Sequence, residues 1–105
     1  MTEEAQLQKL VLEFLRATNL VHWRQGLGGL RTGSGGRRAN PMKGFPDICG
    51  IDSHGRFWGL ELKAAKGVVS EDQKKWHTTL KLSGANIAVC RNFQDAAHFI
   101  NKVRG

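Results

Sequence analysis

The apolar residues nearest the N-terminus recur at helical spacing. Residues 3–18 carry one apolar stripe, made of Leu7, Leu10, Val11, Phe14 and Leu15. This spacing is the period of an amphipathic helix. Thr2 is a suitable N-cap, and the acids Glu3 and Glu4 suit the positive end of the helix dipole. The pattern therefore predicts a helix over residues 3–18.

Shorter apolar stretches further along the chain are typical of strands. They predict strands at residues 20–25, 47–52, 56–64 and 86–91. The second and third of these strands are separated by Ser53-His54-Gly55, a three-residue hairpin loop that ends in glycine. Ser70 and Gln73 resemble a capping box and open a helix that runs to about residue 83, and residues 94–103 predict a closing helix. The element order αβββαβα predicts a single mixed α/β domain over residues 1–105.

A glycine-rich stretch interrupts this pattern between the first two strands. Of the nineteen residues from Gly26 to Gly44, seven are glycine. The stretch also carries four basic residues, Arg31, Arg37, Arg38 and Lys43. A long loop between two core elements is more often functional than a plain linker, so we expect it to contact a ligand.

Composition narrows the class of protein. The 105 residues include 16 Lys+Arg against 9 Asp+Glu, a formal charge of +7. Such an excess favours a polyanionic partner, nucleic acid first of all. No apolar run approaches the ~20 residues of a membrane span, and the start is acidic rather than signal-like. We therefore expect a soluble cytoplasmic protein, in which Cys49 and Cys90 are reduced core residues because no zinc-type cysteine pair occurs.

Two carboxylates stand at a spacing that a hairpin brings together. If residues 53 to 55 form the loop, residue 52 faces 56, and counting outward places Asp47 opposite Glu61 on one sheet face. Lys63 follows on the same face because strand side chains alternate. Two close acids need a positive charge between them, and Mg²⁺ prefers oxygen ligands, which here include the Leu62 carbonyl. The pattern predicts a metal-dependent phosphodiesterase, with Lys63 positioning the attacking water or neutralising the phosphate.

At this point the motifs resemble a known family. Gly44-Phe45-Pro46-Asp47 followed by Glu61-Leu62-Lys63 is similar to the motif of the PD-(D/E)xK nuclease superfamily. The flanking segments narrow the resemblance to the virus-type replication-repair nuclease (VRR-NUC) family, over almost the whole chain. They are the acidic first helix, the Trp-Arg strand, the Gly-Arg-x-x-Gly strand and the Ser-x-x-Gln helix.

The resemblance implies a restriction-endonuclease-like fold, a mixed central sheet flanked by helices, and cleavage of DNA with Mg²⁺ or Mn²⁺. For stand-alone members it implies a homodimer acting on branched DNA such as Holliday junctions. Asp47 and Glu61 would then be catalytic metal ligands, Leu62 a backbone ligand and Lys63 the catalytic lysine. On the first helix Glu4 is the best metal ligand, since it lies near the apolar stripe; Glu3 stays open, whereas Glu13 points away.

Residues expected to contact DNA surround this motif. They are Arg24, Arg37, Arg38, Lys43, Lys66 and Gln73. Each also has a plainer interpretation: the arginines and lysines as a solvated surface, and Gln73 as a cap of its own helix. The four histidines show no ligand spacing, and the three tryptophans fit a core better than a base-stacking surface.

Two other functions stay open at this stage. One is a basic nucleic-acid-binding module without catalysis, in which the acidic pair is incidental. The other is a nuclease subunit that needs a partner protein to choose its substrate. For a phage protein, the compartment would be the host cytoplasm.

Overall fold

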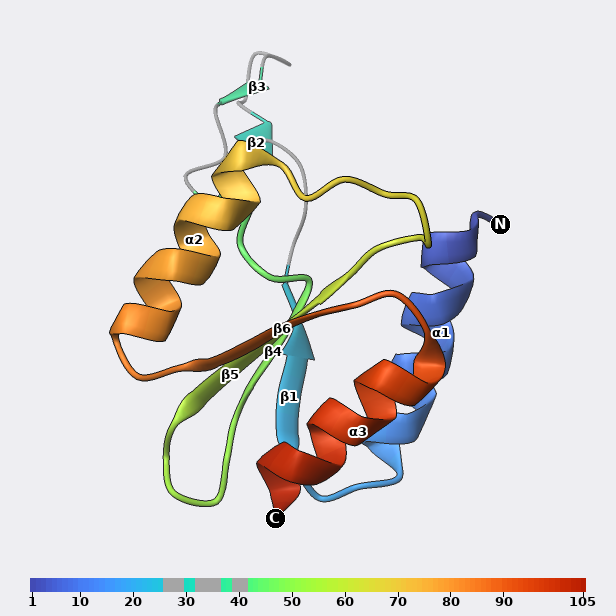
Figure 1. Cartoon of the computed structure of the whole chain (residues 1–105), viewed down its shortest axis with the longest axis vertical. Helices are drawn as coiled ribbons and strands as arrows, with labels where there is room; N and C mark the ends of the chain where they lie inside the picture. Colours follow the sequence, from blue (N-terminus) through green and yellow to red (C-terminus); the bar gives the residue numbers. More distant parts are fainter. Residues whose placement is uncertain (26–29, 32–36, 39–41) are drawn as a thin grey trace.

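The computed structural model describes residues 1–25, 30–31, 37–38 and 42–105 (Figure 1). Three helices and a four-stranded sheet organise this part of the chain. None of its helices has the length and apolar character that crossing a bilayer requires. The predicted mixed α/β architecture is confirmed.

The first helix, α1 (Glu3–Arg16), is capped by Thr2, whose hydroxyl accepts a hydrogen bond from the Ala5 N–H at 3.0 Å. Its buried residues Leu7, Val11 and Leu15 belong to the predicted stripe. The helix ends two residues earlier than predicted. The Thr18 hydroxyl donates to the carbonyl of Leu15 and accepts from the N–H of Leu20, and these bonds turn the chain toward the sheet.

The sheet has the strand order β1 (Val21–Arg24), β4 (Ile48–Ile51), β5 (Phe57–Leu62), β6 (Asn86–Cys90). β1 pairs antiparallel with β4, and β4 antiparallel with β5, whereas β5 and β6 are parallel. Helix α2 (Glu71–Leu82) connects the parallel pair. The sheet is therefore mixed, as expected.

The element order differs from the prediction in one place. The stretch expected to be only a loop contains β2 (Leu30–Arg31) and β3 (Arg37–Arg38), which pair antiparallel as a separate two-stranded sheet. Strands of two residues are too short to produce an alternating pattern, and surrounding glycines hide them further. The order αβββαβα is corrected to αβββββαβα.

The helices cover the two faces of the sheet unequally. Figure 1 shows α1 and α3 (Phe93–Arg104) together on one side and α2 alone on the other. The apolar core lies between the sheet and the first pair: Leu7, Val11, Leu15, Ile48, Trp58, Leu60, Leu62, Cys90, Ala96, Ile100 and Val103. Because strand side chains alternate, residues 47, 49, 59 and 61 belong to the α2 side of the sheet. The acidic pair therefore lies away from the main core.

Candidate active site

The segment that leads into Asp47 is held by close packing. Gly44 adopts a φ of +87°, and a Cβ placed there would lie 2.5 Å from the backbone carbon of Asp72 at the start of α2. Phe45 contacts Trp76 edge to face at 4.9 Å between ring centroids. The Pro46 ring covers Gly59 so closely that a Cβ on Gly59 would be 2.9 Å away. Each contact ties the Gly-Phe-Pro-Asp motif to α2 or to β5.

The register of the β4–β5 hairpin brings the two acids together. Ile48 pairs with Leu60 and Ile51 with Phe57, so one further step along the ladder places Asp47 opposite Glu61. This register prediction is confirmed. Oδ2 of Asp47 also accepts a hydrogen bond from the Leu62 N–H at 3.0 Å, and both carboxylates are buried. Two acids distant in sequence thus share one water-poor location.

Burial makes the negative charge on Glu61 costly. The pKa of its carboxyl lies far above its usual range, chiefly because burial disfavours the ionised form. The neighbouring Asp47 carboxyl raises this pKa further, whereas the charge of Lys63 opposes the shift. Within the described part of the chain, Glu61 Oε2 has no hydrogen-bond partner. An acidic pair with an unpartnered buried oxygen fits a site for a hard cation.

His77 contacts this pair from α2, an arrangement that the scattered histidines did not suggest. Its Nε2 lies 3.4 Å from Oε1 of Glu61, and the imidazole is buried. Burial, together with the charges of Lys81 and Lys63, lowers the pKa of His77, although the negative charge of Asp47 opposes this shift. The lowered pKa favours the neutral ring. The sequence did contain one indication of this position. His77 lies four residues after Gln73 and three before the half-buried Leu80, so the three residues share one face of the helix.

A cavity of about 200 Å³ opens beside Asp47 and distinguishes the two acids of the first helix. It is lined by Thr2, Glu4, Ala5, Gln8, Asp47 and Leu62. Glu3 is directed elsewhere, since its Oε1 accepts a hydrogen bond from the Ala65 N–H at 3.2 Å. Gln8 was not singled out, although its position one helical turn after Glu4 places it on the same face.

These residues do not form a complete metal centre. Across residues 1–25, 30–31, 37–38 and 42–105, no group of three or more His, Cys, Asp or Glu side chains is close enough to hold a metal ion. Asp47 and Glu61 lie together, whereas Glu4 lines the neighbouring cavity. The carboxylate pair fits a cation, whereas Glu4 lies across the cavity that Asp47 also lines.

Lys63 emerges from the end of β5 beside the acids. It is half-buried, and its backbone N–H donates to the Cys90 carbonyl at 3.1 Å. Arg91 braces the segment that follows, donating through Nη1 to the carbonyls of Ala64 at 2.9 Å and Gly67 at 2.6 Å. The backbone on both sides of Lys63 is thereby fixed.

The residues expected to contact DNA are only partly assembled around the pair. Arg24 is exposed and adjoins Gln25, whose N–H donates to the Asp47 carbonyl at 2.8 Å. Lys43 forms an exposed ion pair with Asp72 at 3.5 Å, and Lys66 is exposed.

Gln73 takes part in a capping box. Its Oε1 accepts from the Ser70 N–H at 2.8 Å, and its own N–H donates to the Ser70 hydroxyl at 3.2 Å. The capping interpretation is therefore confirmed. The side chains of Arg37 and Arg38 lie outside the described residues.

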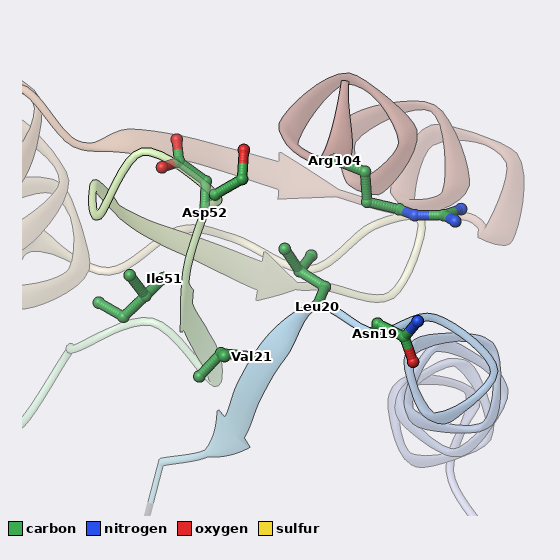
Figure 2. A pocket seen from close by; sticks show the side chains of 7 residues that line it. Asn19, Leu20, Val21, Ile51, Asp52 and Arg104 are labelled. Carbon is green, nitrogen blue, oxygen red and sulfur yellow. The ribbon is translucent and has the colours of Figure 1, made fainter.

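A second cavity, of about 260 Å³, lies at the opposite end of the sheet (Figure 2). Asp52 reaches it from the β4–β5 connection and Arg104 from the end of α3. The Asp52 carboxylate already accepts hydrogen bonds from the N–H groups of His54 and Arg56 and from Arg56 Nε. With its acid satisfied in this way, this cavity is a weaker candidate for catalysis than the one at Asp47.

Comparisons with known proteins identify the family of this domain. The family model described as VRR-NUC domain matches residues 36–94, a span that contains Asp47, Glu61, Lys63 and His77. A solved structure titled "VRR_NUC domain" superposes with a TM-score of 0.69 at 22% identity, covering 96% of this chain and 97% of that one. No curated protein matches the sequence.

Proposed function

Since this chain belongs to the VRR-NUC domain family, a family of PD-(D/E)xK nucleases, we propose that it is an endonuclease that hydrolyses DNA with Mg²⁺ or Mn²⁺. The observation that supports this most directly is the buried juxtaposition of Asp47 and Glu61, in which Glu61 Oε2 has no partner among the described residues. A structural role alone does not account for two adjacent buried acids, because their mutual repulsion opposes folding.

Asp47 and Glu61 would hold the metal together with the Leu62 carbonyl, and Glu4, which lines the cavity beside Asp47, is a further candidate ligand. When bound, a divalent cation lowers the pKa of a coordinated water and stabilises the charge that builds on the phosphate. The Leu62 N–H holds one oxygen of Asp47, which restricts this carboxylate to one orientation. The two acids are thus positioned before the substrate arrives.

Lys63 would act on the reacting phosphate. It lies two residues after Glu61, directly beyond the end of β5, and its charge opposes the upward shift of the Glu61 pKa. An ammonium here counters the negative charge on the phosphate and orients the attacking water. The bracing of residues 64–67 by Arg91 keeps the backbone of this lysine in place.

The DNA backbone would approach across the end of the sheet that carries Asp47. Arg24 and Lys43 are exposed near this end, and we propose that they contact phosphates together with the exposed Lys66. We propose Arg37 and Arg38 as further phosphate contacts from the sequence alone. Phosphate contacts position a duplex without reading its sequence. We therefore propose recognition of DNA shape, such as a branch or junction.

One active site cuts one strand, so cleavage of both strands is easiest for a symmetric dimer. We propose a homodimer that presents two such sites. Light scattering with size-exclusion chromatography measures this directly, and a monomeric mass in the presence of DNA would contradict it.

The test of the proposed function is a nuclease assay on labelled duplex, single-stranded, flapped and four-way-junction DNA with Mg²⁺, Mn²⁺ or EDTA. We expect metal-dependent cleavage by the wild type, its loss in Asp47→Asn and Lys63→Met, and its retention in the controls Glu13→Gln and Lys102→Met. Binding of DNA without cleavage under any metal would instead favour a non-catalytic module. Cleavage that appears only when a partner protein is added would favour the subunit alternative.

A further inference from the structure

We propose that His77 is a positioning residue that holds Oε1 of Glu61 and thereby directs Oε2 toward the metal. The inference rests on the proposed function and adds a residue outside the acidic motif. It starts from two facts about one carboxylate: Oε1 lies 3.4 Å from His77 Nε2, and Oε2 has no hydrogen-bond partner in the described structure.

The helix that carries His77 is fixed at the site. The capping box of Ser70 and Gln73 determines where α2 begins. Its first turn packs on the backbone of Gly44, where no side chain fits, and Trp76 packs against Phe45. His77 follows Trp76 directly, so the same segment that positions Asp47 also determines where the imidazole meets Glu61.

The chemistry requires a donor at this position. A neutral imidazole with the proton on Nε2 donates to a carboxylate oxygen and adds no positive charge that would compete with a cation. A carboxylate with one oxygen held in this way loses the freedom to rotate. A metal ligand that is also hydrogen-bonded to a second protein group binds metal more tightly, and loss of such a group typically costs about 10–100-fold in metal affinity or activity.

A packing role makes a different prediction, which two substitutions separate. His77→Leu fills a similar volume with an apolar side chain and removes the donor. His77→Gln instead keeps an N–H donor, which reaches the position that Nε2 occupies in the wild type. Leu80→Ala is the matched control, because it shortens a half-buried residue of the same helix that has no hydrogen-bond donor for Glu61. If His77 only packs, metal affinity will follow thermal stability across all three variants.

The experiment is a titration of each DNA-free protein with Mn²⁺, with free Mn²⁺ followed by electron paramagnetic resonance and folding by thermal melting. We expect His77→Leu to weaken Mn²⁺ binding at least about 10-fold, and His77→Gln to restore it to within about 3-fold of the wild type. Leu80→Ala should lower the melting temperature and leave Mn²⁺ affinity unchanged. Equal affinity in wild type and His77→Leu would overturn the inference, as would equal losses in His77→Leu and Leu80→Ala.

A spectroscopic readout that needs no metal covers the case in which His77→Leu does not fold. In the ¹⁵N spectrum of the metal-free wild type, recorded at a pH above the raised pKa of Glu61 so that its carboxylate can only accept, the His77 nitrogens should show the Nε2-protonated form and shift in Glu61→Gln. An Nδ1-protonated ring would contradict the proposed hydrogen bond. Failure of the wild type to bind Mn²⁺ at all would refute the proposed function itself, and is thus distinguishable from failure of the role of His77.

Discussion

Oδ2 of Asp47 accepts a hydrogen bond from the backbone N–H of Leu62, at 3.0 Å and across fifteen positions of sequence. The acceptor belongs to the Gly-Phe-Pro-Asp segment, and the donor is the middle residue of Glu-Leu-Lys. One short contact therefore couples the two halves of the nuclease motif. It also separates two contributions of Asp47, a hydrogen-bond acceptor that maintains the local structure and a negative charge available to a cation.

Asp47→Asn should separate these two contributions. An asparagine oxygen accepts the same hydrogen bond from Leu62, so we expect the metal-free variant to melt at or above the wild-type temperature. The loss of charge weakens the proposed metal ligand, and cleavage should fall by more than about 100-fold, the upper range for loss of a supporting residue. Thermal melts and initial cleavage rates measure the two effects, and a variant with near wild-type rates would remove Asp47 from the metal site.

The buried acid Glu61 predicts an unusual dependence of stability on pH. Its pKa is raised in the folded protein, chiefly by burial, so the folded state binds a proton more tightly than the unfolded state. The resulting stabilisation is fully present below the ordinary range of glutamate and is lost as pH rises toward the folded pKa. We expect the metal-free protein to lose at least about 1 kcal/mol of unfolding free energy on this rise.

Glu61→Gln should remove this loss and raise the melting temperature at neutral pH, while abolishing stabilisation by Mn²⁺. Denaturant unfolding at a series of pH values in EDTA measures the loss of unfolding free energy with rising pH. Glu13→Gln, on the exposed side of α1, is the matched control. A wild-type stability that is flat across this range would show that Glu61 is not destabilised by its surroundings.

Asp52 follows β4 at the end away from Asp47, and its lowered pKa predicts a pH dependence of stability opposite in sign to that of Glu61. Hydrogen bonds from the Arg56 backbone lower the pKa of its carboxyl most, with His54 and the Arg56 charge contributing further, against the opposing effect of burial. Its contribution to stability is present above the ordinary range of aspartate and is lost as pH falls through the lowered pKa. Asp52→Asn should therefore lower the melting temperature at pH 7 more than at pH 3 and leave metal affinity unchanged, because Asp52 lies at the far end of the strands.

The sequence predicted the elements and the acidic pair because both depend on local periodicity. The spacing of Leu7, Val11 and Leu15 determined the first helix, and a three-residue loop sufficed to place Asp47 opposite Glu61. Where a prediction needed only strand alternation and a turn, it was confirmed.

Contacts between distant elements were not predictable in this way. The approach of His77 to Glu61 depends on how α2 lies over the sheet, and no pattern within the helix contains that information. The two-residue strands β2 and β3 were missed because each spans a single period of strand alternation, too little to repeat a pattern. The separation of Glu3 from Glu4 required knowing where residue 65 lies. Tertiary packing, rather than propensity, decides the position of His77 and the separation of the two glutamates.

Two glycines with positive φ allow the packing of the motif to be tested against backbone strain alone. Gly44 has a φ of +87° and Gly55 a φ of +78°. A Cβ on Gly55 would meet nothing within 4 Å, whereas a Cβ on Gly44 would lie 2.5 Å from Asp72 and 2.7 Å from the Gln73 nitrogen, both backbone atoms. The two positions share the conformational cost of alanine and differ in available space.

We expect Gly55→Ala to cost about 1 kcal/mol of unfolding free energy, the strain of a left-handed alanine, and to retain cleavage. Gly44→Ala should cost about 3 kcal/mol or more, because the backbone clash with α2 adds to the same strain. It should also reduce cleavage where the protein is still folded, since the displaced segment carries Asp47 on one side and disturbs the helix of His77 on the other. Denaturant unfolding followed by cleavage rates at a temperature where both variants are folded measures this. Equal losses of stability at the two positions would mean that α2 does not pack on the motif as described.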